Sequence, residues 1–230
     1  MAAKGSIFSQ ETFRFFRELG RNNHKPWMDE NRERYRAVLV EPLRGLLERL
    51  TPAARKLNPR FACGGRVGEN FSRINRDIRF ARDKSPYRTQ MYLFFAEPEG
   101  GAQLYVGISA DSVTCGFRVY SEGRTSPLVQ VGRPRGRENP AWIARQKRRL
   151  AKYDSYWYAT EKGEWAKRKG WPVEPDNWKK LQAWVVRRKF APAVATRAGF
   201  EREIAKIFRE VYPLYSFTIA QTWKAKSGRV

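Results

Sequence analysis

The segment from Arg73 to Thr89 is the densest group of side chains in this chain that are able to do chemistry. Six cations and two carboxylates fall within these seventeen residues. If residues 73–79 are extended, alternation places two arginines and an aspartate on one face. Two guanidiniums that converge can hold a phosphate or carboxylate through paired hydrogen bonds. We therefore expect an anion-binding pocket whose ligand-binding residues are Asn23, Trp27, Arg73, Arg76, Asp77, Arg79, Asp83, Lys84 and Tyr87.

In such a pocket the arginines and the lysine supply the charge. Tyr87 and Asn23 supply hydrogen bonds, and Trp27 forms an apolar wall. Asp77 orients an arginine. The same residues also have a purely structural interpretation, in which an internal Arg–Asp network pins the loop to the helices. A further hypothesis is a metal-assisted hydrolase or phosphoryl-transfer enzyme that uses Asp77 or Asp83 as base or Mg²⁺ ligand, although the surrounding cations disfavour a divalent ion.

A second candidate region runs from Trp142 to Phe190 and holds fourteen cations and ten aromatic residues. Cations interleaved with Trp and Tyr are typical of proteins that bind single-stranded nucleic acid, because phosphates pair with the cations and bases stack on the rings. The alternative is that the tryptophans are core residues and the cations a solvated face. The candidate nucleic-acid-binding residues form a stripe at helical spacing: Arg145, Arg148, Arg149 and Lys152.

Two motifs carry a resemblance to a known family. The first reads Asn-Asn-x-Lys-x-Trp at residues 22–27, and the second reads Arg-Ile-x-Arg-Asp-x-Arg-Phe-x-x-Asp-Lys-Ser-Pro-Tyr-x-Thr at residues 73–89. Together they resemble an uncharacterised bacterial and fungal family, domain of unknown function 2461. The resemblance covers most of the chain and implies one α+β domain with both motifs as its signature. It implies no particular activity, so whether the protein is an enzyme stays open.

Composition limits the class of protein. The 230 residues carry a formal net charge of +23, which favours an anionic small molecule or nucleic acid as partner. The aromatic content of 14% is too high for a disordered chain. Two cysteines and one histidine are too few for a disulfide framework or a closed zinc site, and we assign no metal or cofactor. We expect a cytoplasmic protein without membrane contact, because no apolar run reaches the length of a signal peptide or a membrane span.

Familiar catalytic motifs do not occur in the sequence. It contains no P-loop, dinucleotide fingerprint, nucleophile elbow or zinc-ligand spacing. Cys63, beside two glycines, is more simply a small buried residue than a nucleophile. His24 stands in a polar turn, and we expect it to be dispensable.

The first part of the chain, residues 1–58, is expected to be helical. Ser9 is a candidate N-cap, Phe8 and Phe13 form a candidate hydrophobic staple, and Gly20 is expected to close the first helix. Pro26 fits the first turn of a second helix. A third helix is expected from Pro42, because leucines recur there at helical spacing: Leu43, Leu46, Leu47 and Leu50.

Residues 59–120 hold the motif loop and three predicted strands, with alternating apolar residues after Met91, Leu104 and Val113. The short connections between them, such as the turn at 97–101, predict an antiparallel meander. Residues 121–230 are expected to be helical after a long loop at 121–138.

In this last part Asn139 and Asp176 are candidate N-caps, a short strand is expected at 185–190, and a last helix is expected to stop before Pro213. The order of helices, strands and helices predicts an α+β fold in a single domain, residues 1–230.

Overall fold

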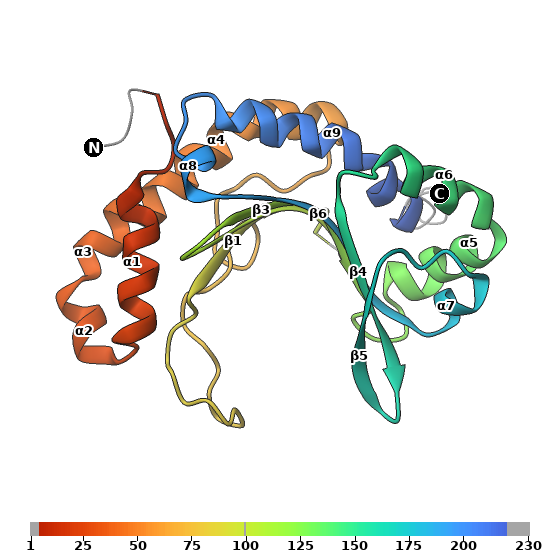
Figure 1. Cartoon of the computed structure of the whole chain (residues 1–230), viewed down its shortest axis with the longest axis horizontal. Coiled ribbons are helices and arrows are strands. Elements are labelled where there is room, and N and C mark those ends of the chain that lie inside the picture. Colours follow the sequence, from red (N-terminus) through yellow and green to blue (C-terminus); the bar gives the residue numbers. More distant parts are fainter. Residues whose placement is uncertain (1–4, 99, 220–230) are drawn as a thin grey trace, which may run out of the picture. The chain divides into compact units, whose positions relative to one another are not determined.

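The computed structural model describes residues 5–98 and 100–219, and its α+β order of helices, strands and helices confirms the predicted fold class (Figure 1). Glu99, inside the predicted turn, lies outside the described residues. The helices are α1 (Gln10–Arg21), α2 (Lys25–Glu30), α3 (Arg32–Tyr35), α4 (Glu41–Leu57), α5 (Arg133–Glu138), α6 (Pro140–Arg149), α7 (Pro175–Lys179), α8 (Pro192–Ala195) and α9 (Phe200–Ile219), with π-helical segments η1 (Arg36–Val40) and η2 (Leu128–Gly132). The strands are β1 (Gln90–Phe95), β2 (Ala102–Ser109), β3 (Val113–Tyr120), β4 (Asp154–Glu161), β5 (Glu164–Lys169) and β6 (Leu181–Phe190).

The first helix begins where the sequence predicts. Ser9 is the N-cap of α1, and its main-chain N–H donates to the Thr12 hydroxyl at 3.3 Å. The helix passes through Gly20, which was expected to end it, and closes one residue later. There the N–H of Asn22 donates to the carbonyl of Glu18 at 2.9 Å.

An arginine on α3 ties the N-terminal helices together. The Arg34 guanidinium donates to carboxylates of Glu11 and Glu18 on α1, with 2.9 Å between Arg34 Nε and Glu11 Oε1. The hydrogen bond from Arg34 holds the pKa of Glu18 below its usual range. This bridge holds the turn between α1 and α2 in place, and that turn carries Asn23.

The strands form one six-stranded antiparallel sheet in the order β1-β2-β3-β6-β4-β5. The three consecutive strands at its beginning are the predicted meander, and β6 extends the predicted strand at 185–190 toward the N-terminus. In β1 buried and half-buried side chains alternate, with Met91, Leu93 and Phe95 buried, whereas β2 and β3 are buried along most of their length.

The β4–β5 hairpin was not expected from the sequence. Its two strands meet through Lys162 and Gly163, which both have positive φ, 49° and 84°. Positive φ at both central residues matches a type I′ turn, whose usual sequence signal is Asn-Gly or Asp-Gly. Lys-Gly gives a weaker signal, and β5 is almost entirely exposed, so no apolar alternation marks it.

The predicted loop at 121–138 is wrong over its second half, because η2 and α5 occupy residues 128–138. The glycines and prolines that suggest a loop serve close packing instead. A Cβ on Gly136 would lie 1.9 Å from the ring of Trp178 on α7, so glycine lets the helix approach the indole. Arg133 donates from Nε to the carbonyl of Leu181 at 2.8 Å.

The last helix does not stop before Pro213 as predicted, but continues to Ile219. Pro213 costs one main-chain hydrogen bond. The turns that follow it bury Leu214 and Tyr215 completely, and the Thr218 hydroxyl donates to the Tyr215 carbonyl at 2.9 Å. Burial of these side chains offsets the helix-breaking tendency of proline.

The chain packs as two compact units that are interleaved along the sequence, so the predicted single domain remains a prediction. Of the described residues, unit 1 comprises 5–95, 106–114 and 189–205, and unit 2 comprises 96–98, 100–105, 115–188 and 206–219. The core of unit 1 lies between α1, α4 and β1, whereas that of unit 2 includes the fully buried indoles of Trp178 and Trp184. In the described part of the chain no helix combines the length and apolarity needed to cross a bilayer.

Candidate functional site

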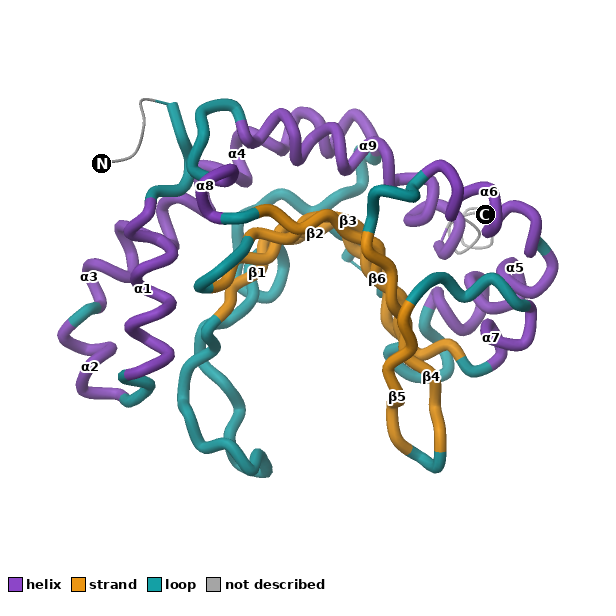
Figure 2. The backbone as a smooth tube through the Cα atoms, in the orientation of Figure 1, coloured by secondary structure: helices purple, strands orange, loops and turns teal. Residues whose placement is uncertain are grey.

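The segment 73–89 folds back on itself just before β1, as an irregular excursion without helix or regular strand (Figure 2). Its two legs are joined by an isolated bridge between Asn75 and Tyr87. The N–H of Arg76 donates to the Pro86 carbonyl, and the N–H of Arg88 donates to the Ile74 carbonyl, both at 2.8 Å. The loop tip therefore lies between residues 77 and 85.

Asn23 fastens this loop to the helical part of unit 1. Its side-chain amide donates from Nδ2 to the Tyr87 carbonyl at 2.9 Å, and its Oδ1 accepts from the Tyr87 N–H at 3.0 Å. The amide therefore pairs with the main chain of Tyr87 as a neighbouring strand would, and the Tyr87 side chain is buried. The structure brings Asn23 and Tyr87 of the predicted site together through main-chain atoms of Tyr87.

Both aspartates of the loop pair with arginines of the loop. Arg79 donates to both oxygens of Asp77, at 3.0 Å from Nε and 2.6 Å from Nη2, while Arg76 forms an ion pair with Asp83. Lys84 Nζ donates to the carbonyl of Ile78 at 3.0 Å.

These contacts also lower the pKa of both carboxyls. The hydrogen bond from Arg79 lowers the pKa of Asp77, and hydrogen bonds from Ser85 and then Arg76 lower that of Asp83. Such stabilised carboxylates are poor general bases.

The predicted alternation from 73 to 79 is present. The side with Arg73 is exposed, whereas Arg76 lies half-buried on the opposite side with Ile74 and Ile78. Phe80, near the tip, is 95% exposed. The exposed residues of the alternation are Arg73, Asn75, Asp77 and Arg79.

A cavity of about 790 Å³ lies between this loop and β1. Within residues 5–98 and 100–219, the guanidiniums of Arg73 and Arg88 have no hydrogen-bond or ion-pair partner, and both line the cavity. We call it the Arg73–Arg88 cavity. Its remaining lining residues are Gly68, Phe71, Ser72, Asn75, Arg76, Asp77, Ile78, Arg79, Tyr92 and Phe94.

The floor of the Arg73–Arg88 cavity is set by the sheet. Tyr92 and Phe94 alternate with the buried residues of β1 and therefore lie on the opposite side of the strand. A Cβ on Gly107 would lie 2.6 Å from the Tyr92 ring, so the glycine in β2 lets that ring lie flat against the neighbouring strand. The Ser72 hydroxyl accepts from the Tyr92 N–H at 2.9 Å and joins the loop to the floor.

Four of the nine predicted ligand-binding residues line the Arg73–Arg88 cavity. Arg73, Arg76, Asp77 and Arg79 line the cavity as a set, but Arg88 was absent from the predicted site. Arg88 has no carboxylate close to it in the sequence, and this feature could have identified it as an unpaired cation.

The other predicted residues lie outside the cavity lining. Asn23, Asp83, Lys84 and Tyr87 support the loop instead. The Trp27 ring is half-buried on α2, with its centroid 5.4 Å from that of Phe15.

His24 also has a structural role. Its Nδ1 accepts the N–H of Trp27 at 3.3 Å, so it caps α2.

A smaller cavity of about 290 Å³ adjoins the same loop segment and shares Phe71, Ser72, Arg73 and Asn75 with the first. Its other walls include Tyr35 and Met91. The Tyr35 hydroxyl donates to Met91 Sδ at 3.7 Å, and burial raises the pKa of this phenol.

In unit 2 the predicted nucleic-acid-binding cations lie on α6 and just after its end. Arg145, Arg148 and Lys152 are exposed, but Arg149 donates to Gln146 Oε1 at 2.8 Å and to the Glu210 carbonyl at 2.6 Å. The tryptophans do not accompany the stripe. Trp157, Trp178 and Trp184 are buried, and Trp142 stacks on Phe217 with 4.0 Å between ring centroids.

The described residues give no support to the metal hypothesis. Among the described residues no group of three or more His, Cys, Asp or Glu side chains is arranged to hold a metal ion. Asp77 and Asp83 each hydrogen-bond to a different guanidinium.

The sequence matches the family described as "Conserved hypothetical protein (DUF2461)" over residues 11–217. Among curated proteins no relative matches the chain. The matched range contains both motifs that suggested this family, together with the loop and the Arg73–Arg88 cavity. The chain therefore belongs to the conserved hypothetical protein family DUF2461.

Proposed function

We propose that this protein binds a small molecule bearing a phosphate or carboxylate group in the Arg73–Arg88 cavity. The observation that carries the proposal is the pair of guanidiniums that line the cavity without a partner among the described residues. An anion that binds them breaks no existing ion pair, whereas an anion at Arg76 or Arg79 must compete with Asp83 or Asp77. The charge available to a ligand therefore comes from Arg73 and Arg88.

The remaining lining favours a ligand with an apolar or aromatic part. Phe71, Tyr92 and Phe94 present ring surface next to the two guanidiniums. Aromatic rings bind flat apolar groups through contact area and offset stacking. A cavity of about 790 Å³ falls in the range usual for small-molecule sites. A planar group with an anionic substituent, such as a nucleotide, fits this chemistry.

The other two hypotheses from the sequence have less support. Asp77 and Asp83 are engaged by arginines, so an enzyme that uses either as base or metal ligand must first release it. Of the four cations in the predicted nucleic-acid stripe, Arg149 is engaged by a side-chain and a main-chain oxygen.

Thermal unfolding in the presence of anions tests the proposal. We expect sulfate and a nucleoside monophosphate to raise the melting temperature above that in chloride at equal ionic strength, because a ligand that binds only the folded state stabilises it. The variant Arg73→Gln/Arg88→Gln should lose this specific increase while keeping its melting temperature in chloride. Both side chains are exposed, so their loss leaves no buried partner unsatisfied.

A charge-matched control separates the cavity from net charge. Arg21→Gln/Arg55→Gln removes the same charge from exposed positions at the ends of α1 and α4. This control should respond to sulfate as the wild type does. An equal loss in both double variants would contradict the proposal, and so would a wild type that responds to sulfate no more than to chloride.

A further inference from the structure

The β4–β5 hairpin in unit 2 gathers aromatic and basic side chains on one face. The register pairs Tyr156 with Lys169, Tyr158 with Lys167 and Thr160 with Trp165. Residues directly opposite in an antiparallel pair point to the same side, so these six side chains share a face. The pairing of Asp154 with Arg187 on β6 adds that arginine to the same side. We call this surface the hairpin face, made of Tyr156, Tyr158, Trp165, Lys167, Lys169 and Arg187.

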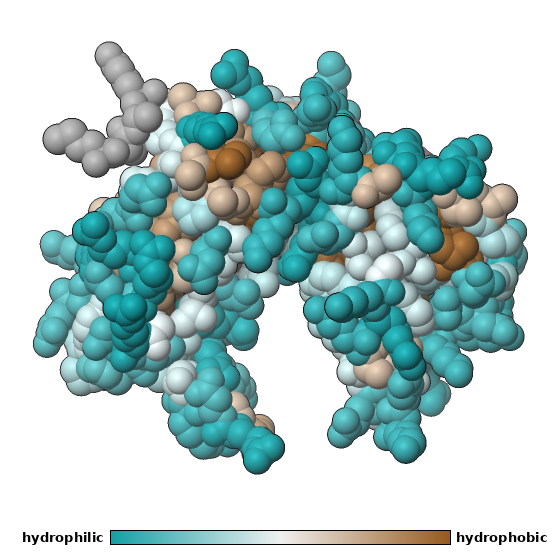
Figure 3. All heavy atoms as spheres, viewed as in Figure 1, coloured by the Kyte–Doolittle hydropathy of each residue, from teal (hydrophilic) through white to brown (hydrophobic). Residues whose placement is uncertain are grey.

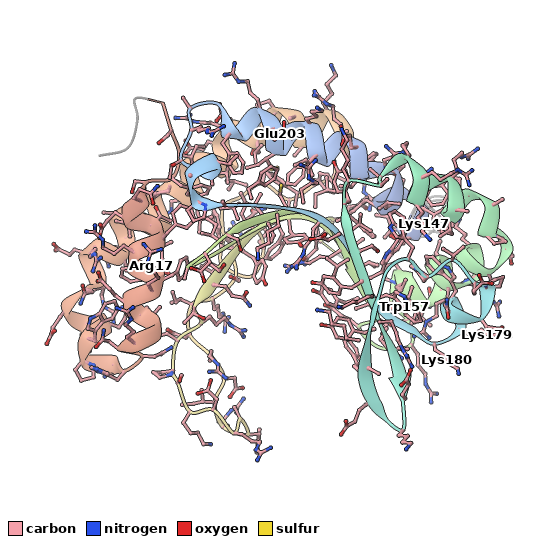
Figure 4. All side chains as sticks on the ribbon, in the orientation of Figure 1. Arg17, Lys147, Trp157, Lys179, Lys180 and Glu203 are labelled. Carbon is pink, nitrogen blue, oxygen red and sulfur yellow. The ribbon has the colours of Figure 1, made fainter. Side chains whose placement is uncertain are left out.

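The rings of the hairpin face follow one another in a row. The centroids of Tyr156 and Tyr158 are 6.0 Å apart, and those of Tyr158 and Trp165 are 6.1 Å apart. Trp165 ends the row and is 50% exposed, an unusual degree for an indole. The opposite side of β4 is part of the core, since Trp157 and Ala159 are buried, and Figure 4 shows Trp157 on the α7 side of the strand. The hairpin face itself is exposed at Trp165, Lys167 and Lys169, and its two tyrosines are half-buried.

The cations of the hairpin face stand beside these rings. Lys167 Nζ lies 4.2 Å from the centroid of the Tyr156 ring, and Arg187 Cζ lies 5.1 Å from it. The Nε of Arg187 is buried and has no hydrogen-bond partner among the described atoms. By register, the carboxylate on this face is that of Asp154 at the start of β4. Glu161 and Glu164 lie on the other side, where Glu161 pairs with Arg168.

We propose that the hairpin face binds single-stranded nucleic acid. Trp165 and Tyr158 stack on bases, while Lys167, Lys169 and Arg187 pair with phosphates. The two tyrosines of β4 stand opposite the two lysines of β5, so a single strand of nucleic acid that runs along the hairpin meets both rings and cations. Figure 3 shows mainly hydrophilic side chains over the hairpin, which suits a polyanion better than an apolar protein surface. This proposal is independent of ligand binding in the Arg73–Arg88 cavity, which lies in unit 1.

Fluorescence anisotropy with a labelled oligothymidylate of about 16 nucleotides tests the proposal. We expect Trp165→Ala to weaken binding about tenfold, the effect of losing one base–ring stack, and Trp165→Phe to retain most of the affinity. Trp165 is half exposed, so the variant should fold, and its melting temperature checks this. Unchanged affinity in folded Trp165→Ala would overturn the proposal.

Salt dependence provides a second measurement. Lys167→Gln/Lys169→Gln should make the slope of log affinity against log salt shallower by about 1.4, since each phosphate contact on a single strand contributes about 0.7. The matched control, Lys147→Gln/Arg148→Gln on α6, should leave the slope nearly unchanged. An equal reduction in the control would place binding elsewhere or show that it is diffuse, and would overturn the proposal.

Competitors distinguish the class of partner. Unlabelled single strands should displace the probe more effectively than a duplex of the same sequence, because bases stacked in a duplex cannot reach Trp165. A duplex that competes equally well would contradict base stacking. Vesicles with anionic lipid that bind in a Trp165-dependent manner, without any oligothymidylate binding, would replace the proposal with a membrane contact.

Discussion

The loop at 73–89 and the hairpin at 154–169 are both rich in cations, but they use them differently. In the loop, Arg76 and Arg79 are engaged by aspartates a few residues away. In the hairpin, Lys167 and Lys169 stand beside tyrosines across the strand pair, and Glu161 and Glu164 point to the other side. The loop therefore pairs two of its arginines with its own aspartates, whereas Lys167 and Lys169 of the hairpin have no carboxylate partner among the described residues.

The physical reason is the range over which each arrangement acts. Opposite charges close in sequence meet whenever a loop turns, so they neutralise one another whatever the rest of the fold does. Side chains of the same kind collect on one face of a strand pair only when the strands pair in a particular register, because the side-chain period of a strand is two. Arg73 and Arg88 lie on the legs of the loop, where main-chain pairing separates them from the aspartates of the tip.

The largest effect is expected at the amide that fastens the loop. Asn23→Ala removes two hydrogen bonds to main-chain groups of Tyr87, next to a buried side chain. Leaving such groups unpaired should lower the free energy of unfolding by about 2 kcal/mol. Denaturant unfolding measures this value.

The control for that experiment is Asn22→Ala, which removes one side-chain hydrogen bond, to the Glu18 carbonyl at 3.0 Å. Asn22→Ala should lower the free energy of unfolding by less than Asn23→Ala does. If Arg79→Ala destabilises the protein more than Asn23→Ala does, the loop is held by its charges and our account of it is wrong.

A smaller effect is expected at the hairpin turn. Gly163 has φ of 84° and open space around a would-be Cβ, so Gly163→Ala introduces only backbone strain, about 1 kcal/mol. Hydrogen exchange of the β5 amides should become faster. Lys162→Asn should have the opposite effect. Asparagine tolerates positive φ better than lysine does, so this variant should slow hydrogen exchange of the β5 amides. Unchanged exchange in both variants would show that the turn does not set the register.

The smallest effect is expected from acid, and only in the loop. Since the pKa of Asp77 and of Asp83 is lower in the folded protein, their contribution to stability is complete above the unfolded values near 4 and disappears as pH falls through the folded values. NMR signals of residues 76–85 should therefore shift below about pH 4. Signals of residues 142–149 on α6, a stretch without Asp or Glu, serve as the control, and a larger shift there would contradict this prediction.

Local patterns were sufficient for much of the fold. The leucines of α4, the Ser9 cap of α1 and the alternating strands of the meander are all readable without tertiary information, because each depends on neighbours within one or two turns or on a period of two. The same holds for the alternation from Arg73 to Arg79. The pairing of charges within the loop was also open to prediction, as the structural alternative to the anion pocket.

Tertiary packing decided the remainder. Pro213 lies inside a helix because burial of Leu214 and Tyr215 outweighs its cost, and Gly136 belongs to a helix because the Trp178 indole needs the space. Arg88 joins Arg73 only because two legs of a loop pair in front of β1. Lys167 meets Tyr156 only because β4 and β5 pair in one register. Such contacts join residues whose positions depend on the whole chain, and no local pattern in the sequence encodes them.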